Sequence, residues 1–323
     1  MSFNINDIQW QNEEYKDNYM KQVMDLKQLE SDRSPVPGQD SKYEIENWID
    51  FNVIQENKVI KLATYKQRAQ NEIKAVLIIF HGLNSHIGQS SHIAEFLSKK
   101  GIEVVGYDFR GFGKSEGIRG YCESVQQHIE DANKFVSLIE NIYSNKKIFI
   151  AGQSWGGSTV YKLSLDNPNR FQGVILYAPA IKDNKYNSRI GKFFVGILAS
   201  IYPKLHTLPQ RFGLSNKNLN VPDELMKDPY AYNGNIIVGT IKHILNLSSQ
   251  LENTYKDYKA RFLCLTAGKD KLVDPLLGFQ LNHESPSEDK THIFYNNCWH
   301  NMWKEQEIYE MNQVVADWIL KRI

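Results

Sequence analysis

The chain has 323 residues, of which 41% are hydrophobic, 12% aromatic and 23% charged, a balance that excludes a disordered or fibrous protein. Its 38 Lys and Arg residues nearly equal its 37 Asp and Glu residues, for a formal charge of +1, so no basic surface of the kind that binds nucleic acid is expected. At this length the chain can form one large α/β domain with an insertion, or two ordinary domains.

The cysteines and the first residues bear on the cellular compartment. Cys122, Cys264 and Cys298 are far apart and include no Cys-x-x-Cys pair, so neither a disulfide framework nor a zinc site is predicted. The N-terminal residues are polar and carry no apolar signal sequence. The longest apolar runs are far shorter than the ~20 residues that cross a bilayer. We expect a cytoplasmic protein.

Residues 1–42 are expected to be an appendage to the main domain. Turn-forming residues cluster within 31–38, which contains Pro35, Pro37 and Gly38. The main domain is predicted to span residues 43–323. It begins with two antiparallel strands, residues 44–51 and 58–65, joined by a polar turn at 55–57.

A series of short apolar runs then alternates with segments of helical periodicity. Such runs are typical of strands buried on both faces of a parallel sheet, and they occupy residues 75–80, 103–107, 147–151, 173–177, 261–266 and 291–295. Apolar residues recur at helical spacing over 125–143 and 308–318. The series predicts an α/β fold with a mostly parallel, doubly wound sheet.

Residues from about 180 to 258 interrupt this alternation without an obvious strand. We interpret them as an inserted, mainly helical cap over the carboxyl ends of the strands, where open α/β sheets bind their ligands. The cap contains the apolar run 193–202. Phe193, Phe194 and Leu198 within it are expected to contact substrate, although a buried cap helix explains the run about as well.

Ser154 is the predicted nucleophile. It lies in Gly-Gln-Ser-Trp-Gly (residues 152–156), between a predicted strand and a predicted helix, which is the context of the sharp turn that lifts a serine Oγ out of a sheet. Residues 113–117 also read Gly-x-Ser-x-Gly, but charged residues flank Ser115 and no apolar strand leads into it. We interpret Ser115 as a loop residue.

A serine nucleophile needs a base and a group that orients the base. His300 follows the predicted strand 291–295, and Asp270 follows the predicted strand 261–266. The resulting chain order of serine, acid and histidine is that of the α/β-hydrolases. Asp274 is the rival acid, but the adjoining Pro275 favours a turn or helix start there.

The N–H groups of Leu83 and Trp155 are expected to form the oxyanion hole, since one follows the nucleophile and the other lies in the loop after residues 75–80. His81 is expected to brace that loop. The glycine-containing loop 108–116 fits neither common phosphate-binding motif. No cofactor or metal is therefore predicted.

Together these motifs resemble the monoacylglycerol lipase and lysophospholipase-like branch of the α/β-hydrolases, a serine aminopeptidase-type family. The matching pieces are residues 81–86, 107–117, 152–156, 267–275 and His300, within a resemblance that spans 43–323. The family triad falls on Ser154, Asp270 and His300. Departures occur at Asn84 and Ser85, where the family often has Gly-Glu, and in the weakly matching cap.

The resemblance implies hydrolysis of a lipid carboxylic ester, a monoacylglycerol or lysophospholipid, through an acyl-enzyme. Its expected partner is a lipid or small ester, with peripheral membrane contact through the cap left open. A general carboxylesterase, a peptidase or an acyltransferase remains an alternative, because the same site serves all of them. A slow-turnover ligand receptor that keeps a hydrolase site is an alternative from a different class.

Overall fold

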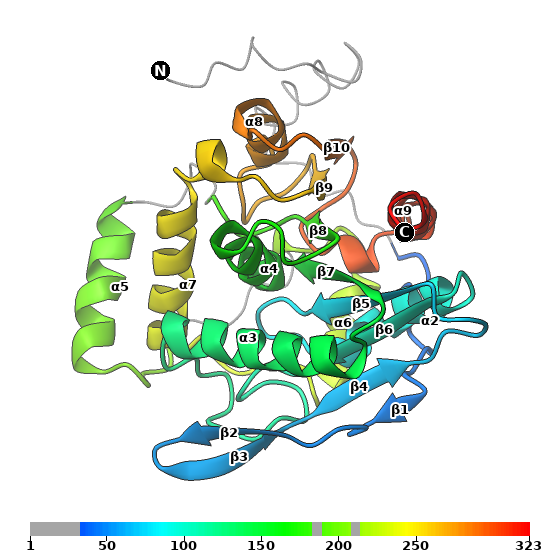
Figure 1. The fold of residues 1–323 in the computed structure, drawn as a ribbon. Coiled ribbons are helices and arrows are strands. Elements are labelled where there is room, and N and C mark those ends of the chain that lie inside the picture. Colours follow the sequence, from blue (N-terminus) through cyan, green and yellow to red (C-terminus); the bar gives the residue numbers. More distant parts are fainter. Residues whose placement is uncertain (1–32, 183–188, 208–213) are drawn as a thin grey trace.

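A computed structural model describes residues 33–182, 189–207 and 214–323, with the backbone alone for 189–194. Within these ranges the core is an eight-stranded sheet (Figure 1). The strands in spatial order are β1 (Ile45–Glu46), β4 (Thr64–Gln67), β6 (Ile102–Tyr107), β5 (Ala75–Phe80), β7 (Lys147–Gln153), β8 (Gly173–Tyr177), β9 (Phe262–Ala267) and β10 (Lys290–Tyr295).

The sheet is parallel from β6 to β10, and its central strands are apolar because they are covered on both faces. Every residue of β5 is buried, with Ile78 beside Val105 of β6 on one side and beside Ile150 of β7 on the other. Both β1 and β4 pair in antiparallel fashion at one edge. The predicted mostly parallel α/β sheet is confirmed.

The two strands predicted at residues 44–51 and 58–65 are wrong in their extent, because the structure has four short strands in this region. A separate hairpin joins β2 (Phe51–Gln55) to β3 (Lys58–Leu62) through a turn at Glu56 and Asn57, both of which have positive φ. Ala63 ends β3: its N–H donates to Ser115 Oγ and its carbonyl accepts from Asp108 N–H. The chain then enters the main sheet as β4.

Helices cover the sheet, and they include α2 (Ser91–Ser98), α3 (Val125–Ile142), α4 (Trp155–Asp166), α8 (Leu277–Glu284) and α9 (Ile308–Leu320). In Figure 1, α3 and α4 lie in front of the strands, and α2 and α9 lie together at the right. The Ser124 side chain caps α3 by accepting the Gln127 N–H at 3.0 Å. The helical spacing seen over 125–143 corresponds to its buried face, which includes Ala132 and Val136.

In the described residues between β8 and β9, the segment predicted as a cap, there are three α-helices: α5 (Arg189–Ile201), α6 (Asn220–Lys227) and α7 (Val238–Leu251). Helix α5 packs against α7, at the left of Figure 1. None of the helices in the described ranges has the length and apolar character needed to span a membrane. Residues 33–42 contact the main body, since the Pro37 carbonyl accepts from Lys304; the domain boundary at residue 42 stays a prediction.

Candidate active site

Ser154 occupies a sharp turn between β7 and α4, with φ 54° and ψ −115°. Residues other than glycine rarely adopt this backbone conformation. The flanking glycines make this turn possible. A Cβ at Gly152 would lie 2.2 Å from the Gly156 carbonyl oxygen, and one at Gly156 would lie 2.2 Å from the Phe80 carbonyl oxygen. Since neither contact is tolerable, only glycine fits at both positions.

The structure brings His300 and Asp270 to this serine from two other loops. His300 Nε2 lies 2.8 Å from Ser154 Oγ, and His300 Nδ1 lies 2.7 Å from Asp270 Oδ2. The second carboxylate oxygen of Asp270 accepts the N–H groups of Leu272 and Val273 at 2.8 and 3.0 Å. One carboxylate oxygen is therefore fixed by backbone while the other faces the imidazole.

The rival acid, Asp274, faces away from this pair. Its Oδ2 is 3.0 Å from Lys182 Nζ, and its Oδ1 accepts the Leu276 N–H at 2.9 Å. The carboxylate thus forms an ion pair with the start of the cap and contributes to the start of the helical turn before α8. Asp274 therefore stabilises the structure through these contacts and does not orient His300.

Leu83 and Trp155 both line the cavity beside Ser154. Neither of their N–H groups has an acceptor in the described part of the chain. Trp155 is the first residue of α4, where helix geometry leaves N–H groups free and concentrates positive potential. Both amides are consequently available to a negatively charged oxygen.

His81 braces the loop that carries Leu83. Its Nδ1 donates to the Gly82 carbonyl at 2.7 Å, and its Nε2 accepts the Phe109 N–H at 2.9 Å. Burial lowers the pKa of His81 to about 3, so the ring is neutral near pH 7 and can accept the second bond. The ring therefore holds the loop after β5 against the loop after β6.

A cavity of about 440 Å³ opens over Ser154. Its walls are mostly aliphatic, and they come from the loops of the sheet and from the cap: Leu83, Leu214, Leu225, Ile236, Ile241, Ile244, Leu245, Leu272 and Val273. Polar residues also line it: Asn84, Ser85, Gln89, Gln153, Ser215 and Asn301. Such a cavity suits a largely apolar ligand that also carries polar groups.

The predicted substrate contacts all lie on α5, whereas the cap helix that lines the cavity most extensively is α7. The half-buried Leu198 is not among the residues that line the cavity, and the side chains of Phe193 and Phe194 lie outside the described part of the structure. Sequence analysis missed Ile241, Ile244 and Leu245 of α7. Their three- and four-residue spacing marks one face of a helix, but it does not say what that face covers.

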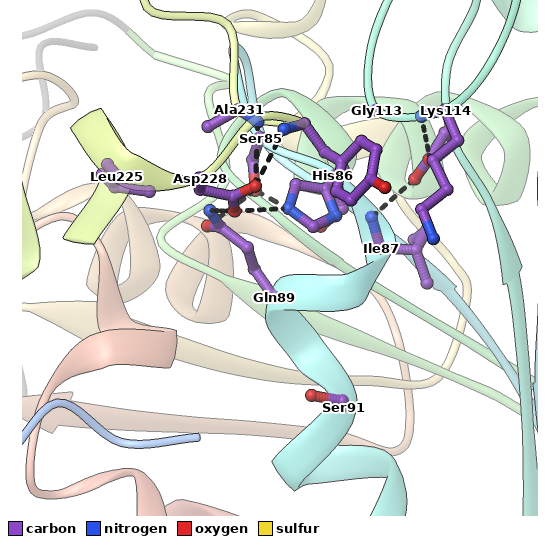
Figure 2. A network of polar contacts seen from close by, with 12 residues as sticks. Ser85, His86, Ile87, Gln89, Ser91, Gly113, Lys114, Leu225, Asp228 and Ala231 are labelled. Atoms are coloured by element: carbon purple, nitrogen blue, oxygen red, sulfur yellow. Dashed lines mark hydrogen bonds and ion pairs between the residues drawn. The ribbon is translucent and has the colours of Figure 1, made fainter. Parts of the chain in front are cut away.

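The cap is fastened to the loop beside Leu83 by His86 and Asp228 (Figure 2). His86 Nε2 lies 2.7 Å from Asp228 Oδ2, and Gln89 Nε2 donates to the same oxygen at 3.3 Å. Burial alone would raise the pKa of Asp228, but the hydrogen bond and charge of His86 outweigh it and hold the pKa below its usual range. The Tyr232 N–H also donates to the Asn84 carbonyl at 2.9 Å.

Among the residues that the structure describes, one group of potential metal ligands is found close to His300 in sequence: Cys298, Glu305 and Glu307, with ligand atoms within 4.8 Å of one another. The Lys217 ammonium already lies 3.0 Å from Glu305 and 3.4 Å from Glu307. Burial raises the pKa of the Cys298 thiol, which therefore stays protonated and is a poor metal ligand. An ion pair accounts for this cluster better than a cation site does.

The strand, elbow and helix at Ser154, on a mostly parallel sheet with a helical cap, define an α/β-hydrolase. Residues 71–307 match the family described as serine aminopeptidase, S33, and the chain belongs to this family. The predicted fold and family are thereby confirmed.

Several relatives of the chain are monoglyceride or monoacylglycerol lipases by name. It is 27% identical to monoglyceride lipase of Rattus norvegicus over 233 residues, which are 72% of this chain and 77% of that one. It is 22% identical to monoacylglycerol lipase of Mycolicibacterium smegmatis, over 77% of this chain and 89% of that one. Among solved structures, a soluble variant of monoglyceride lipase from Saccharomyces cerevisiae has a similar fold, with a TM-score of 0.76 at 17% identity over 88% and 98% of the two chains.

Proposed function

We propose that the protein hydrolyses a carboxylic ester of a lipid, a monoacylglycerol or a lysophospholipid, through an acyl-enzyme on Ser154. The hydrogen-bonded series Asp270, His300 and Ser154, ending in an apolar cavity, carries this proposal. A nucleophile, its base and the group that orients the base are the minimum set for acyl transfer by serine.

In the first half of the reaction, Ser154 Oγ attacks the ester carbonyl carbon while His300 Nε2 accepts the serine proton. The carbonyl oxygen becomes an oxyanion, which the Leu83 and Trp155 N–H groups stabilise. The C–O bond to the alcohol breaks, and the alcohol leaves with the proton from His300. A water molecule then repeats the sequence on the acyl-enzyme, releasing the fatty acid and regenerating Ser154.

Asp270 acts on the base and not on the substrate. With Oδ2 beside His300 Nδ1, it favours the tautomer in which Nε2 is free to accept the serine proton, and it stabilises the imidazolium that forms. The two backbone N–H groups on its other oxygen keep this carboxylate from rotating away.

Two observations support a lipid substrate. The cavity wall contributed by the cap is aliphatic, with Leu225, Ile241 and Leu245 among its residues, and each CH₂ that a ligand buries there is worth about 0.8 kcal/mol. Relatives that share most of their length with this chain are monoacylglycerol lipases by name.

Peripheral membrane contact through the cap remains part of the proposal, because Ile201 and Tyr202 at the end of α5 are each 62% exposed.

The test combines active-site labelling with a substrate panel. A fluorophosphonate should label wild-type protein at one site, Ser154, and the protein should turn over long-chain monoacylglycerols or lysophospholipids faster than acetyl esters. Fast cleavage of peptides alone, or acyl transfer without net hydrolysis, would replace the lipid-ester assignment by one of its alternatives. Labelling without turnover of any substrate would favour a receptor.

A further inference from the structure

Asn301, the residue directly after His300, joins the histidine loop to two other parts of the molecule. Its N–H donates to the Ser215 carbonyl at 2.9 Å, and its Nδ2 donates to Asn216 Oδ1 at 3.0 Å. Its Oδ1 accepts from Gln153 Nε2 at 2.9 Å. Asn301 is thereby hydrogen-bonded to the cap through its backbone and side chain, and to the serine loop through its side-chain oxygen.

Gln153 is equally well placed, because it directly precedes Ser154. It is only 5% exposed, and its Oε1 accepts the Trp303 N–H at 3.3 Å in addition to the bond from its Nε2 to Asn301. The segments that carry the nucleophile and the base are thus tied together by a side-chain amide pair next to both residues.

The cap segment 215–217 also reaches the other neighbour of His300. The Trp299 N–H donates to Glu305 Oε1 at 3.3 Å, and the same carboxylate is 3.0 Å from the Lys217 ammonium through Oε2. The residues immediately before and after His300 are therefore both held by this segment, one through Glu305 and one directly.

We propose that the segment 215–217 positions His300 through Asn301, so that the catalytic base is aligned with Ser154 only while this part of the cap is docked. The proposal deepens the proposed function and rests on it. Asn216 is a positioning residue, because it is 3% exposed and is not among the residues that line the cavity. Asn301 transmits its effect to His300 and also lines the cavity. Since misplacing a catalytic group by about 1 Å can cost on the order of 100-fold in rate, a small shift of the loop is sufficient.

The experiment replaces Asn216 and, as a matched control, a residue just beyond the segment. Asn216→Leu removes the acceptor for Asn301 and keeps the side-chain size. Asn218→Leu is the control, because Asn218 is equally buried at 4% exposed but donates to the Ser34 carbonyl and not to the histidine loop. Both are assayed with an activated short-chain ester, which does not depend on lipid recognition, together with the rate of fluorophosphonate labelling and the melting temperature.

We expect Asn216→Leu to lower kcat and the labelling rate roughly 10-fold with little change in KM, and Asn218→Leu to leave kcat within about twofold even if its melting temperature falls. Asn216→Asp, which keeps an acceptor oxygen, should recover most of the lost kcat. In a double-mutant cycle, adding Asn301→Leu to Asn216→Leu should cost much less than it costs in the wild type.

Equal kcat losses in Asn216→Leu and Asn218→Leu, or a folded Asn216→Leu with wild-type kcat, would overturn the proposal. Additive losses in the cycle would do the same. A wild-type protein without activity on any ester would instead remove the proposed function, so the two failures are distinguishable.

Discussion

Ser115 Oγ donates a hydrogen bond to the carbonyl oxygen of Asp108 at 2.5 Å and accepts the Ala63 N–H at 2.9 Å. The second Gly-x-Ser-x-Gly sequence of the chain therefore uses its serine to join three loop and strand segments. Asp108 fixes the same region through its carboxylate, which accepts the N–H groups of Ile87 and Lys114. The two copies of the motif differ in task because only Ser154 lies between a buried strand and a helix.

The first prediction separates the two serines. Ser154→Ala should lower kcat for ester hydrolysis by roughly 10⁴-fold or more, since it removes the hydroxyl that lies against His300 Nε2. Ser115→Ala should keep most of the activity but leave the Ala63 N–H without its acceptor, at a cost of about 1–3 kcal/mol in the free energy of unfolding. Ester turnover and urea unfolding of both variants are the measurements; substantial turnover by folded Ser154→Ala contradicts the assignment.

The second prediction concerns the two acids after β9. Asp270→Asn should slow turnover by up to ~10⁴-fold with little change in binding, because the imidazole loses both its tautomer and its charge partner. Asp274→Asn should instead weaken the contact with Lys182 and affect stability more than turnover. Steady-state kinetics and thermal unfolding of both variants test this, and a larger kcat loss at Asp274 would reassign the acid.

Sequence alone located the sheet and the elbow because both leave local signals. Strands buried on both faces, such as β5, appear as unbroken apolar runs. The elbow appears as a short Gly-x-Ser-x-Gly pattern, although the contact that requires Gly156 comes from Phe80, which is distant in sequence. The first strands were harder to delimit, because the change of partner at Ala63 depends on Asp108 and Ser115, which are distant in sequence.

The cavity wall could not be predicted in the same way. Both α5 and α7 are apolar on one face, and only their packing decides which of them reaches Ser154. The same holds for His86 and Asp228, whose contact joins residues 142 positions apart. Contacts within the cap and between cap and sheet are tertiary, so periodicity identifies the helices but not their partners.

The third prediction uses Lys304, which is 7% exposed and donates to the Pro37 carbonyl at 3.0 Å. Burial lowers its pKa to about 8, although the charges of Glu224 and Asp228 oppose the shift. The unfolded chain, with an ordinary lysine pKa, binds more protons between pH 8 and about 10.5. The contribution of Lys304 to the free energy of unfolding should thus rise through this window, by roughly 3 kcal/mol in total.

Lys304→Met isolates this contribution, because the tyrosines and cysteines that also titrate at high pH are common to both proteins. The difference in unfolding free energy, wild type minus variant, should be constant below pH 8 and increase above it. Urea unfolding at a series of pH values measures it. Parallel curves for the two proteins would mean that Lys304 titrates normally.

The last prediction compares two cap residues that are both half-buried and that lie on helices packed against each other. Ile241 of α7 lines the cavity over Ser154, whereas Leu198 of α5 does not. If the cavity binds an acyl chain, kcat/KM should climb about fourfold for each added CH₂, because each CH₂ buried is worth about 0.8 kcal/mol, and it should level off where the cavity ends.

Ile241→Asp should flatten this profile, because it should lower kcat/KM for long-chain esters far more than for acetyl or butyryl esters, which do not reach the cap. Leu198→Asp should change the profile little; a selective loss on long-chain esters would instead show that this side chain contacts substrate, as the sequence predicts. The assay is a series of monoacyl esters below their critical micelle concentrations, with melting temperatures measured in parallel. Equal losses on short and long esters in folded Ile241→Asp would show that α7 serves only to pack the cap, and the lipid assignment would lose its structural support.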